Sequence, residues 1–176
     1  MQESKEIEKE VKLAFNETVK TALTGDLLDS HGNNSFRLWK PLKMEIDGKV
    51  FFIGAVLLKI SKSQKSQKLH LNPLYFHYVY MLGSPTEAKN FSYTFEYLGN
   101  EESKSSLVYT GQVLPTDEAF CGYMIHKHFK GLAISHEHLK SQFLIDNKLN
   151  FKVTIRNLKE EAKDENVESG VSDNDD

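Results

Sequence analysis

Leu-Gly-Ser-Pro-Thr-Glu-Ala-Lys-Asn-Phe-Ser-Tyr-Thr-Phe-Glu-Tyr-Leu-Gly, residues Leu82 to Gly99, is the stretch that decides the fold of this chain. A turn led by glycine opens a short polar stretch, and large aromatic residues then alternate with small or charged ones. The aromatic residues are Phe91, Tyr93, Phe95 and Tyr97. Alternation with a period of two is typical of a β-strand that has one face in a core and the other in water. The segment therefore predicts a half-buried strand.

Further segments with strand character lie on both sides of this one. Pro41 suits an edge strand or a bulge because it cannot donate to a ladder, and Asp47-Gly48 is a strong hairpin-turn signal. The near-continuous apolar run 50–60 predicts a central strand that is covered on both faces. Together the segments predict an all-β fold, an antiparallel β-sandwich. The strand candidates are 36–44, 50–60, 74–82, 91–98, 107–109, 122–128 and 149–155.

Two helices are expected around these strands. Apolar residues four apart, from Ile7 through Val19 to Leu23, predict an N-terminal amphipathic helix that Gly25 closes. We favour packing of this helix on its own domain, with a short coiled-coil stub as the alternative. Ser135 is placed to cap a short helix through Phe143, near the last strand. The expected organisation is a helix (1–25), a linker (26–35), the sandwich (36–158) and a disordered acidic tail (159–176).

Composition narrows the classes of function. The net charge of −3 provides no global field for nucleic acid or for an acidic membrane. The lysine-rich run 59–68 is interpreted as a solvated hairpin loop, with a phosphate-contacting patch as the alternative. Cys121 is the only cysteine, so neither a disulfide within the chain nor a cysteine-rich zinc site can form. No run of residues is apolar enough for a membrane span, and we expect a cytoplasmic or nuclear protein.

Several of these segments, in this order, resemble the seven-in-absentia substrate-binding domain, a TRAF-like β-sandwich that recognises target peptides for ubiquitin ligases. The most specific segment is Glu87-Ala-Lys-Asn-Phe-Ser-Tyr93, which follows a strand that ends in Met81-Leu-Gly83. The similarity extends over roughly residues 36 to 157. The other matching segments are Val56–Lys59 with the lysine- and glutamine-rich hairpin after it, Phe143–Asn147, and Lys152–Ile155.

The resemblance implies a substrate-recognition module of the ubiquitin–proteasome system that binds degron-like peptides and forms a homodimer. Its partners would be degron-bearing substrates and the ubiquitin ligase or conjugating-enzyme machinery. Ligases of this family also carry a cysteine-rich RING and zinc fingers, which a chain with one cysteine cannot build. We therefore expect no catalysis by this chain itself, and either a fragment of a longer ligase or a relative without a RING. The alternative function is a TRAF-type oligomeric signalling adaptor.

In this family, target peptides add as an extended strand at an exposed edge near the start of the sandwich. The matching edge here is 36–44, where Trp39 is the only tryptophan, although a tryptophan can equally fill a core. The candidate peptide-binding residues are Phe36, Leu38, Trp39, Leu42 and Met44.

Two histidine pairs suggest a metal site at first sight. His126 and His128 would share a face on a strand, whereas His136 and His138 would point about 200° apart on a helix. No cluster of carboxylates or cysteines supports either pair, so no metal, no cofactor and no catalytic residue is expected, and a metal-dependent hydrolase ranks last.

Overall fold

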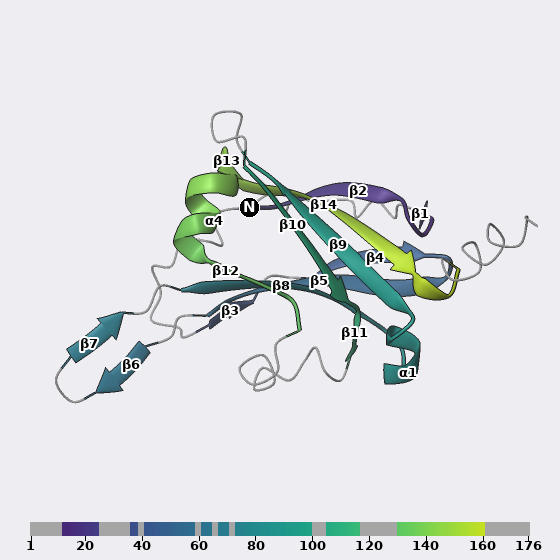
Figure 1. Ribbon diagram of the computed structural model, residues 1–176, viewed down its shortest axis with the longest axis horizontal. Helices are drawn as coiled ribbons and strands as arrows, with labels where there is room; N and C mark the ends of the chain where they lie inside the picture. Colours follow the sequence, from purple (N-terminus) through teal and green to yellow (C-terminus); the bar gives the residue numbers. More distant parts are fainter. Residues whose placement is uncertain are drawn as a thin grey trace, which may run out of the picture.

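The computed structural model describes residues 12–24, 36–38, 41–58, 61–64, 67–70, 73–99, 105–116 and 130–160. In these residues, two β-sheets pack face to face, short helices lie at the margins, and a two-stranded hairpin projects from one end (Figure 1). The predicted antiparallel β-sandwich is therefore confirmed.

The first sheet has the order β1-β4-β5-β8-β11, with β3 beside β5 and β12 beside β8. Its pairings are antiparallel except at the margins, where β1 lies parallel to β4 and β11 lies parallel to β8. Its strands are β1 (Lys12–Leu13), β3 (Phe36–Leu38), β4 (Leu42–Ile46), β5 (Lys49–Leu58), β8 (Leu74–Met81), β11 (Leu114–Pro115) and β12 (Leu132–Ser135).

The second sheet has the order β10-β9-β14-β13, and β2 pairs with β14 on the side away from β9. All of its pairings are antiparallel. The hairpin forms a separate two-stranded sheet. The strands of these two sheets are β2 (Thr18–Thr24), β9 (Phe91–Leu98), β10 (Ser106–Gln112), β13 (Leu144–Ile145) and β14 (Lys148–Asn157), and then β6 (Ser61–Gln64) and β7 (Gln67–His70).

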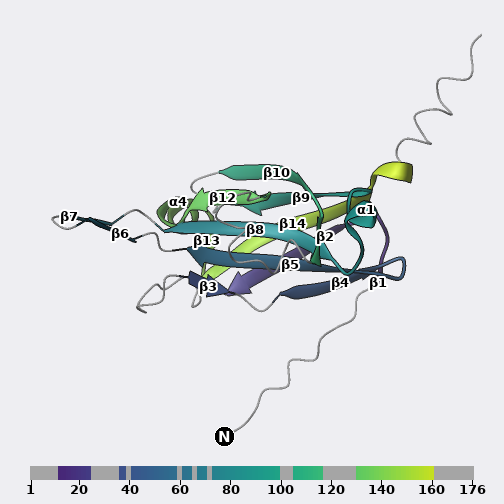
Figure 2. The same cartoon turned by 90° about the horizontal axis from the view of Figure 1, so that it is seen from below.

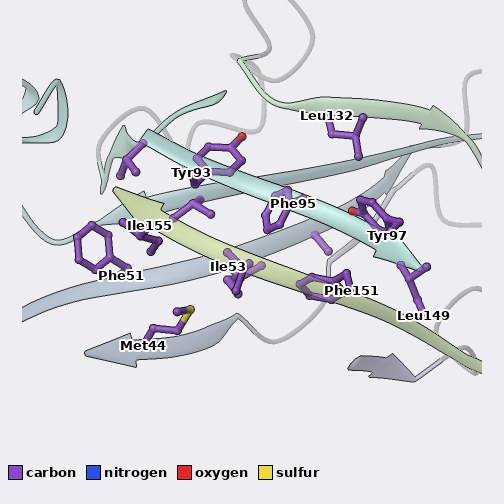
Figure 3. Close-up of a cluster of buried hydrophobic side chains, with 14 of the residues drawn as sticks. Met44, Phe51, Ile53, Tyr93, Phe95, Tyr97, Leu132, Leu149, Phe151 and Ile155 are labelled. Carbon is purple, nitrogen blue, oxygen red and sulfur yellow. The ribbon is translucent and has the colours of Figure 1, made fainter. Parts of the chain in front are cut away.

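The core lies between the two sheets and is rich in aromatic rings (Figure 3). The predicted alternation of residues 91–98 is confirmed in β9, where every second side chain is buried. β14 alternates in the same way and places Phe151, Val153 and Ile155 in the core. Phe51 reaches the core from β5 and packs edge-on against Phe91 at 5.4 Å.

The outer faces of the two sheets differ in character. β5 is a central strand between β4 and β8, and its residues from Ile53 to Leu58 are buried on both faces, as the apolar run predicts. The outer face of the second sheet is polar, and one row of threonines crosses four strands of it. Hydroxyl pairs join this row at 2.9 Å (Thr18 and Thr154) and 3.0 Å (Thr94 and Thr110). A solvated face of this kind leaves the sheet edges as the places where another chain can pair.

The predicted N-terminal helix is wrong over residues 12–24, where the chain forms β1 and β2. β2 pairs with β14 from Thr18, opposite Thr154, to Thr24, opposite Lys148. Side chains of a strand alternate between its two faces, so residues four apart share one face. Val19 and Leu23 therefore lie on the same face of a strand, just as they would lie on the same side of a helix. β-Branched residues are frequent in the segment, and the open edge of β14 provides the ladder that an isolated segment lacks.

The short helices cap the ends of strands. α4 (His136–Phe143) begins as predicted after Ser135, whose hydroxyl accepts a hydrogen bond from the His138 N–H at 3.2 Å. α1 (Pro85–Ala88) was not predicted, although Ser84 followed by Pro85 is a helix-start signal. An ion pair between Lys49 and Glu87 joins α1 to the first residue of β5.

The turns match the sequence signals. Asp47 and Gly48 link β4 to β5, with φ angles of 47° and 73°. Positive φ at two consecutive positions is the geometry of the tight hairpin turns that Asp-Gly favours.

Some expectations fall outside the described residues. These are the linker 26–35, the strand 122–128 and the tail beyond Glu160, while residues 158–160 take a helical conformation. None of the helices in the described ranges is both long enough and apolar enough to cross a membrane.

Candidate peptide-binding edges

Four of the five predicted peptide-binding residues lie on two strands, and the fifth lies outside the described residues. Phe36 and Leu38 lie on β3, Leu42 and Met44 lie on β4, and Trp39 is outside the described residues. Both strands pair with β5, and no strand in the described ranges pairs with the other side of β3. β1 then covers the end of β4 at Glu45 and Ile46.

The register relates β4 and β3 to different apolar clusters through their pairing partners on β5. Met44 is opposite Phe51 and is 8% exposed, in the core between the sheets, and the half-buried Leu42 packs against the same core. Phe36 and Leu38 are opposite Leu58 and Val56, which belong to a second apolar cluster on the other face. Met44 therefore acts as a core residue, and only the β3 end keeps the character of an edge site.

β10 is a second edge, which the sequence pattern does not reveal as a site. It pairs with β9 over its whole length, and no strand in the described ranges pairs with its other side. Side chains along β10 alternate between exposed and half-buried positions, and Val108 is 61% exposed. Leu107, Val108 and Tyr109 signal a strand in the sequence, but only the pairing order shows that it lies at an edge.

The hydrogen bonds at both ends of β10 show which of its backbone groups point outward. The Gly99 N–H donates to the Ser105 carbonyl at 2.9 Å, and the Val113 N–H donates to the Phe91 carbonyl at 3.1 Å. Bonded and non-bonded pairs alternate along an antiparallel ladder, so the odd-numbered residues of β10 bond to β9. The even-numbered residues direct their N–H and C=O groups away from the sheet; they are Ser106, Val108, Thr110 and Gln112.

The inner side of β10 is tied to the core. Tyr109 is half-buried, and its ring centroid lies 6.1 Å from that of Tyr93. Burial raises the pKa of both phenols, so both remain protonated at neutral pH. A Cβ at Gly111 would lie 2.8 Å from the Tyr93 hydroxyl oxygen, which explains the glycine there. The edge is therefore backed by packed rings and presents an ordered row of backbone groups.

The histidines provide no metal site in the described part of the chain. His136 is buried and His138 is exposed, as expected for two residues two positions apart on a helix. No group of three or more histidine, cysteine or acidic residues could hold a metal ion among the described residues. His126, His128 and Cys121 lie outside those residues.

His77 is a buried polar group that no sequence motif marks. It is 0% exposed, stacks on Phe95 at 4.0 Å between ring centroids, and meets Phe151 edge-on at 4.7 Å. Its Nδ1 hydrogen-bonds the Tyr97 hydroxyl. Burial lowers the pKa of His77 to about 3 and raises that of Tyr97, so a neutral imidazole and a protonated phenol share this hydrogen bond. Because core rings surround it, His77 is a structural group.

No protein-family model matches the chain, and no curated protein matches it. Among solved structures, the chain is similar to one described as Notothenia coriiceps TRAF5, at 9% identity. That similarity covers 84% of this chain and 76% of the other, with a TM-score of 0.43. It concerns the arrangement of strands, and no conclusion about partners or activity rests on it.

Proposed function

We propose that this chain is a substrate-recognition module of the ubiquitin–proteasome system, without catalytic activity of its own. It binds extended, degron-like peptides by adding them as a strand to a free sheet edge. The observation that supports peptide binding is the open edge of β10, with its outward row of backbone donors and acceptors. The ubiquitin context and a homodimer are inferred from the resemblance to the seven-in-absentia domain.

The β10 edge suits an extended peptide for physical reasons. Hydrogen bonds to the four outward residues would satisfy the peptide backbone, while alternate side chains along the edge supply selectivity. The edge is already ordered by β9 and by the Tyr93–Tyr109 packing, so binding requires little ordering of the protein. The β3 edge, with Trp39 nearby in the sequence, is the second position proposed for the same function.

The TRAF-type adaptor is the weaker alternative. It relies on an N-terminal helix to oligomerise the sandwich, whereas residues 12–13 and 18–24 form strands. Deletion of residues 1–25 would also remove β2 from the second sheet, so loss of assembly in that variant would not show that a helix mediates it.

Binding of labelled, extended peptides containing proline and valine, measured by fluorescence polarisation, tests the function and its position. We expect dissociation constants in the micromolar range, which corresponds to about −8 kcal/mol. Val108→Pro removes an outward N–H without breaking the ladder to β9, and should weaken binding at least about tenfold. Val108→Thr keeps that N–H and is the matched control, which should bind like the wild type.

The pattern of losses locates the site. Loss of binding in Trp39→Ala, with Val108→Pro unaffected, would move the site to the β3 edge. If no peptide binds the folded protein, the proposal of peptide recognition is wrong.

The ubiquitin context is tested separately, by fusing a selected peptide to a reporter in cells that produce the chain. Reporter levels should fall, and a proteasome inhibitor should restore them; unchanged levels would refute the degradation role and leave peptide binding standing.

A further inference from the structure

β10 presents two kinds of side chain to a strand that adds to its open edge. Figure 2 shows β10 at the margin of the second sheet, beside β9. Its odd-numbered residues from Leu107 to Gly111 are half-buried, and its even-numbered residues from Ser106 to Gln112 are exposed. The half-buried side is the inner face, because Leu107 and Tyr109 pack against the core between the sheets. One face of an added strand would therefore continue the core, and the other would lie in water.

The hydrogen-bonding pattern fixes which residues of an added strand face the core. The outward backbone groups belong to the even-numbered residues of β10, so peptide residues opposite these would form the hydrogen-bonded pairs. Peptide residues opposite Leu107, Tyr109 and Gly111 would form the non-bonded pairs, in which the Cα atoms of an antiparallel ladder are only about 4.5 Å apart. The antiparallel direction is favoured because a parallel pair is slightly less stable per residue. The closest side-chain contacts would thus lie on the inner face.

Two tyrosine rings occupy the space over Gly111. A Cβ at this position would lie 2.8 Å from the Tyr93 hydroxyl oxygen and 2.8 Å from Cε1 of Tyr109. Tyr93 is directly opposite Gly111 on β9, and the centroids of the two rings are 6.1 Å apart. Because Gly111 has no side chain, the tip of Tyr93 extends from β9 as far as β10, the strand at the edge. An added strand would therefore meet aromatic surface at the position opposite Gly111.

We propose that the β10 edge selects peptides in which apolar residues alternate with polar ones, with an aromatic residue opposite Gly111. This inference rests on the proposed function and adds the class of peptide that the edge binds. β10 has seven residues, so the second, fourth and sixth residues of an antiparallel heptapeptide would face the core. An aromatic residue across from a glycine covers the backbone there, and rings pack favourably edge-on or offset against other rings. β-Branched residues suit the positions opposite Tyr109 and Leu107.

Burial explains why the pattern of the peptide matters. Backbone hydrogen bonds to the edge are the same for every peptide sequence, so they provide affinity without selectivity. The apolar side chains differ, because on binding they cover Leu107 and Tyr109, which are only half-buried in the free chain. A peptide that places its apolar residues on the outer face would leave both side chains half-exposed and set polar groups against them.

Two labelled peptides of the same composition test the pattern on the full chain, by fluorescence polarisation. One is Thr-Phe-Thr-Val-Thr-Val-Thr, which has the proposed order. The other is Thr-Thr-Phe-Val-Val-Thr-Thr, which places its apolar residues in one block, and two lysines at each end keep both peptides soluble. The alternating peptide should bind about tenfold more tightly, because all three of its apolar side chains then face the core. This comparison needs only the wild-type chain.

A double-mutant cycle tests the position of the aromatic residue. Replacing the phenylalanine of the alternating peptide by alanine should weaken binding to the wild type about tenfold. In Tyr109→Ala the same replacement should weaken binding about threefold or less, because one ring of the pair over Gly111 is then absent. Thr94→Val, on the polar outer face of β9, is the matched control and should keep the tenfold factor. Circular dichroism checks that each variant folds, and Tyr109→Leu replaces the alanine variant if that one is unfolded.

The outcomes separate this inference from the proposed function. If both peptides bind equally and both lose affinity in Val108→Pro, peptides add to the β10 edge but the alternation is not required, and only this inference is refuted. If the phenylalanine factor is the same in the wild type and in Tyr109→Ala, the position opposite Gly111 is wrong. Binding of proline- and valine-containing peptides alone would refute the pattern and leave the function standing. If no peptide of either kind binds, the proposed function itself fails.

Discussion

His77 shows how a single side chain can make the core sensitive to pH. Its imidazole lies between the two sheets, and its Nε2 has no hydrogen-bond partner among the described residues. The Tyr97 hydroxyl hydrogen-bonds its ring, and the other described groups around it are the rings of Tyr75, Phe95 and Phe151. A positive charge at this position would be buried without a carboxylate to compensate it, which is costly.

The first prediction is that acid destabilises the fold through His77. The unfolded chain binds a proton below the ordinary pKa of 6.5, whereas the folded chain binds it only near 3. Between these values the unfolded state carries more protons, so the stability should fall as pH falls, by about 1.4 kcal/mol per unit. Urea denaturation at several pH values between 7 and about 4 measures this slope.

The control is His77→Asn, which does not titrate and offers a side-chain oxygen to Tyr97. Its slope should be shallower than that of the wild type over the same pH range. Glu87 contributes in the same direction in both proteins, because its hydrogen bond and ion pair with Lys49 lower its pKa. Equal slopes in the two proteins would show that His77 is not the group responsible.

At the scale of elements, β2 shows how a partner strand can override a local pattern. Its side chains alternate, so Val19 and Leu23 pack against the core while Ala22 is exposed. A helix over the same residues would place Ala22 beside that apolar stripe. The strand and the helix therefore predict different environments for Ala22 relative to its neighbour Leu23.

The second prediction compares Leu23→Asp with Ala22→Asp. Leu23→Asp puts a charge against the core and should lower the free energy of unfolding by about 2 kcal/mol or more. Ala22→Asp lies on the polar outer face and should change it by less than about 0.5 kcal/mol. Chemical denaturation of both variants measures the difference, and similar losses in both would contradict the strand.

At the scale of the whole molecule, one core joins the two sheets. Phe51 from the first sheet contacts Phe91 from the second, and Phe15, just before β2, stacks on Phe91 at 5.4 Å. Since the core between the sheets takes its side chains from both of them, we expect the two sheets to unfold together.

The third prediction follows from that shared core. Phe51→Ala should cost about 3–5 kcal/mol, and far-ultraviolet and near-ultraviolet circular dichroism should still lose their signals at one denaturant concentration. Lys43→Ala, at an exposed position of neighbouring β4, is the control and should be nearly neutral. Two separate transitions would mean that the sheets are independent.

The sequence by itself determined the strands whose hydrophobic pattern has only one interpretation. The alternation of β9 and β14, the apolar run of β5, the Asp-Gly turn and the Ser135 cap are local signals, and the sandwich follows from them. Only the tertiary structure decided the features that depend on pairing. The open edge of β14 turned an apparent helix into β2, the register placed Met44 in the core, and the strand order left β10 at an edge. The physical reason is that a side-chain pattern reports which faces are buried, whereas an edge is defined by the neighbour that a strand lacks.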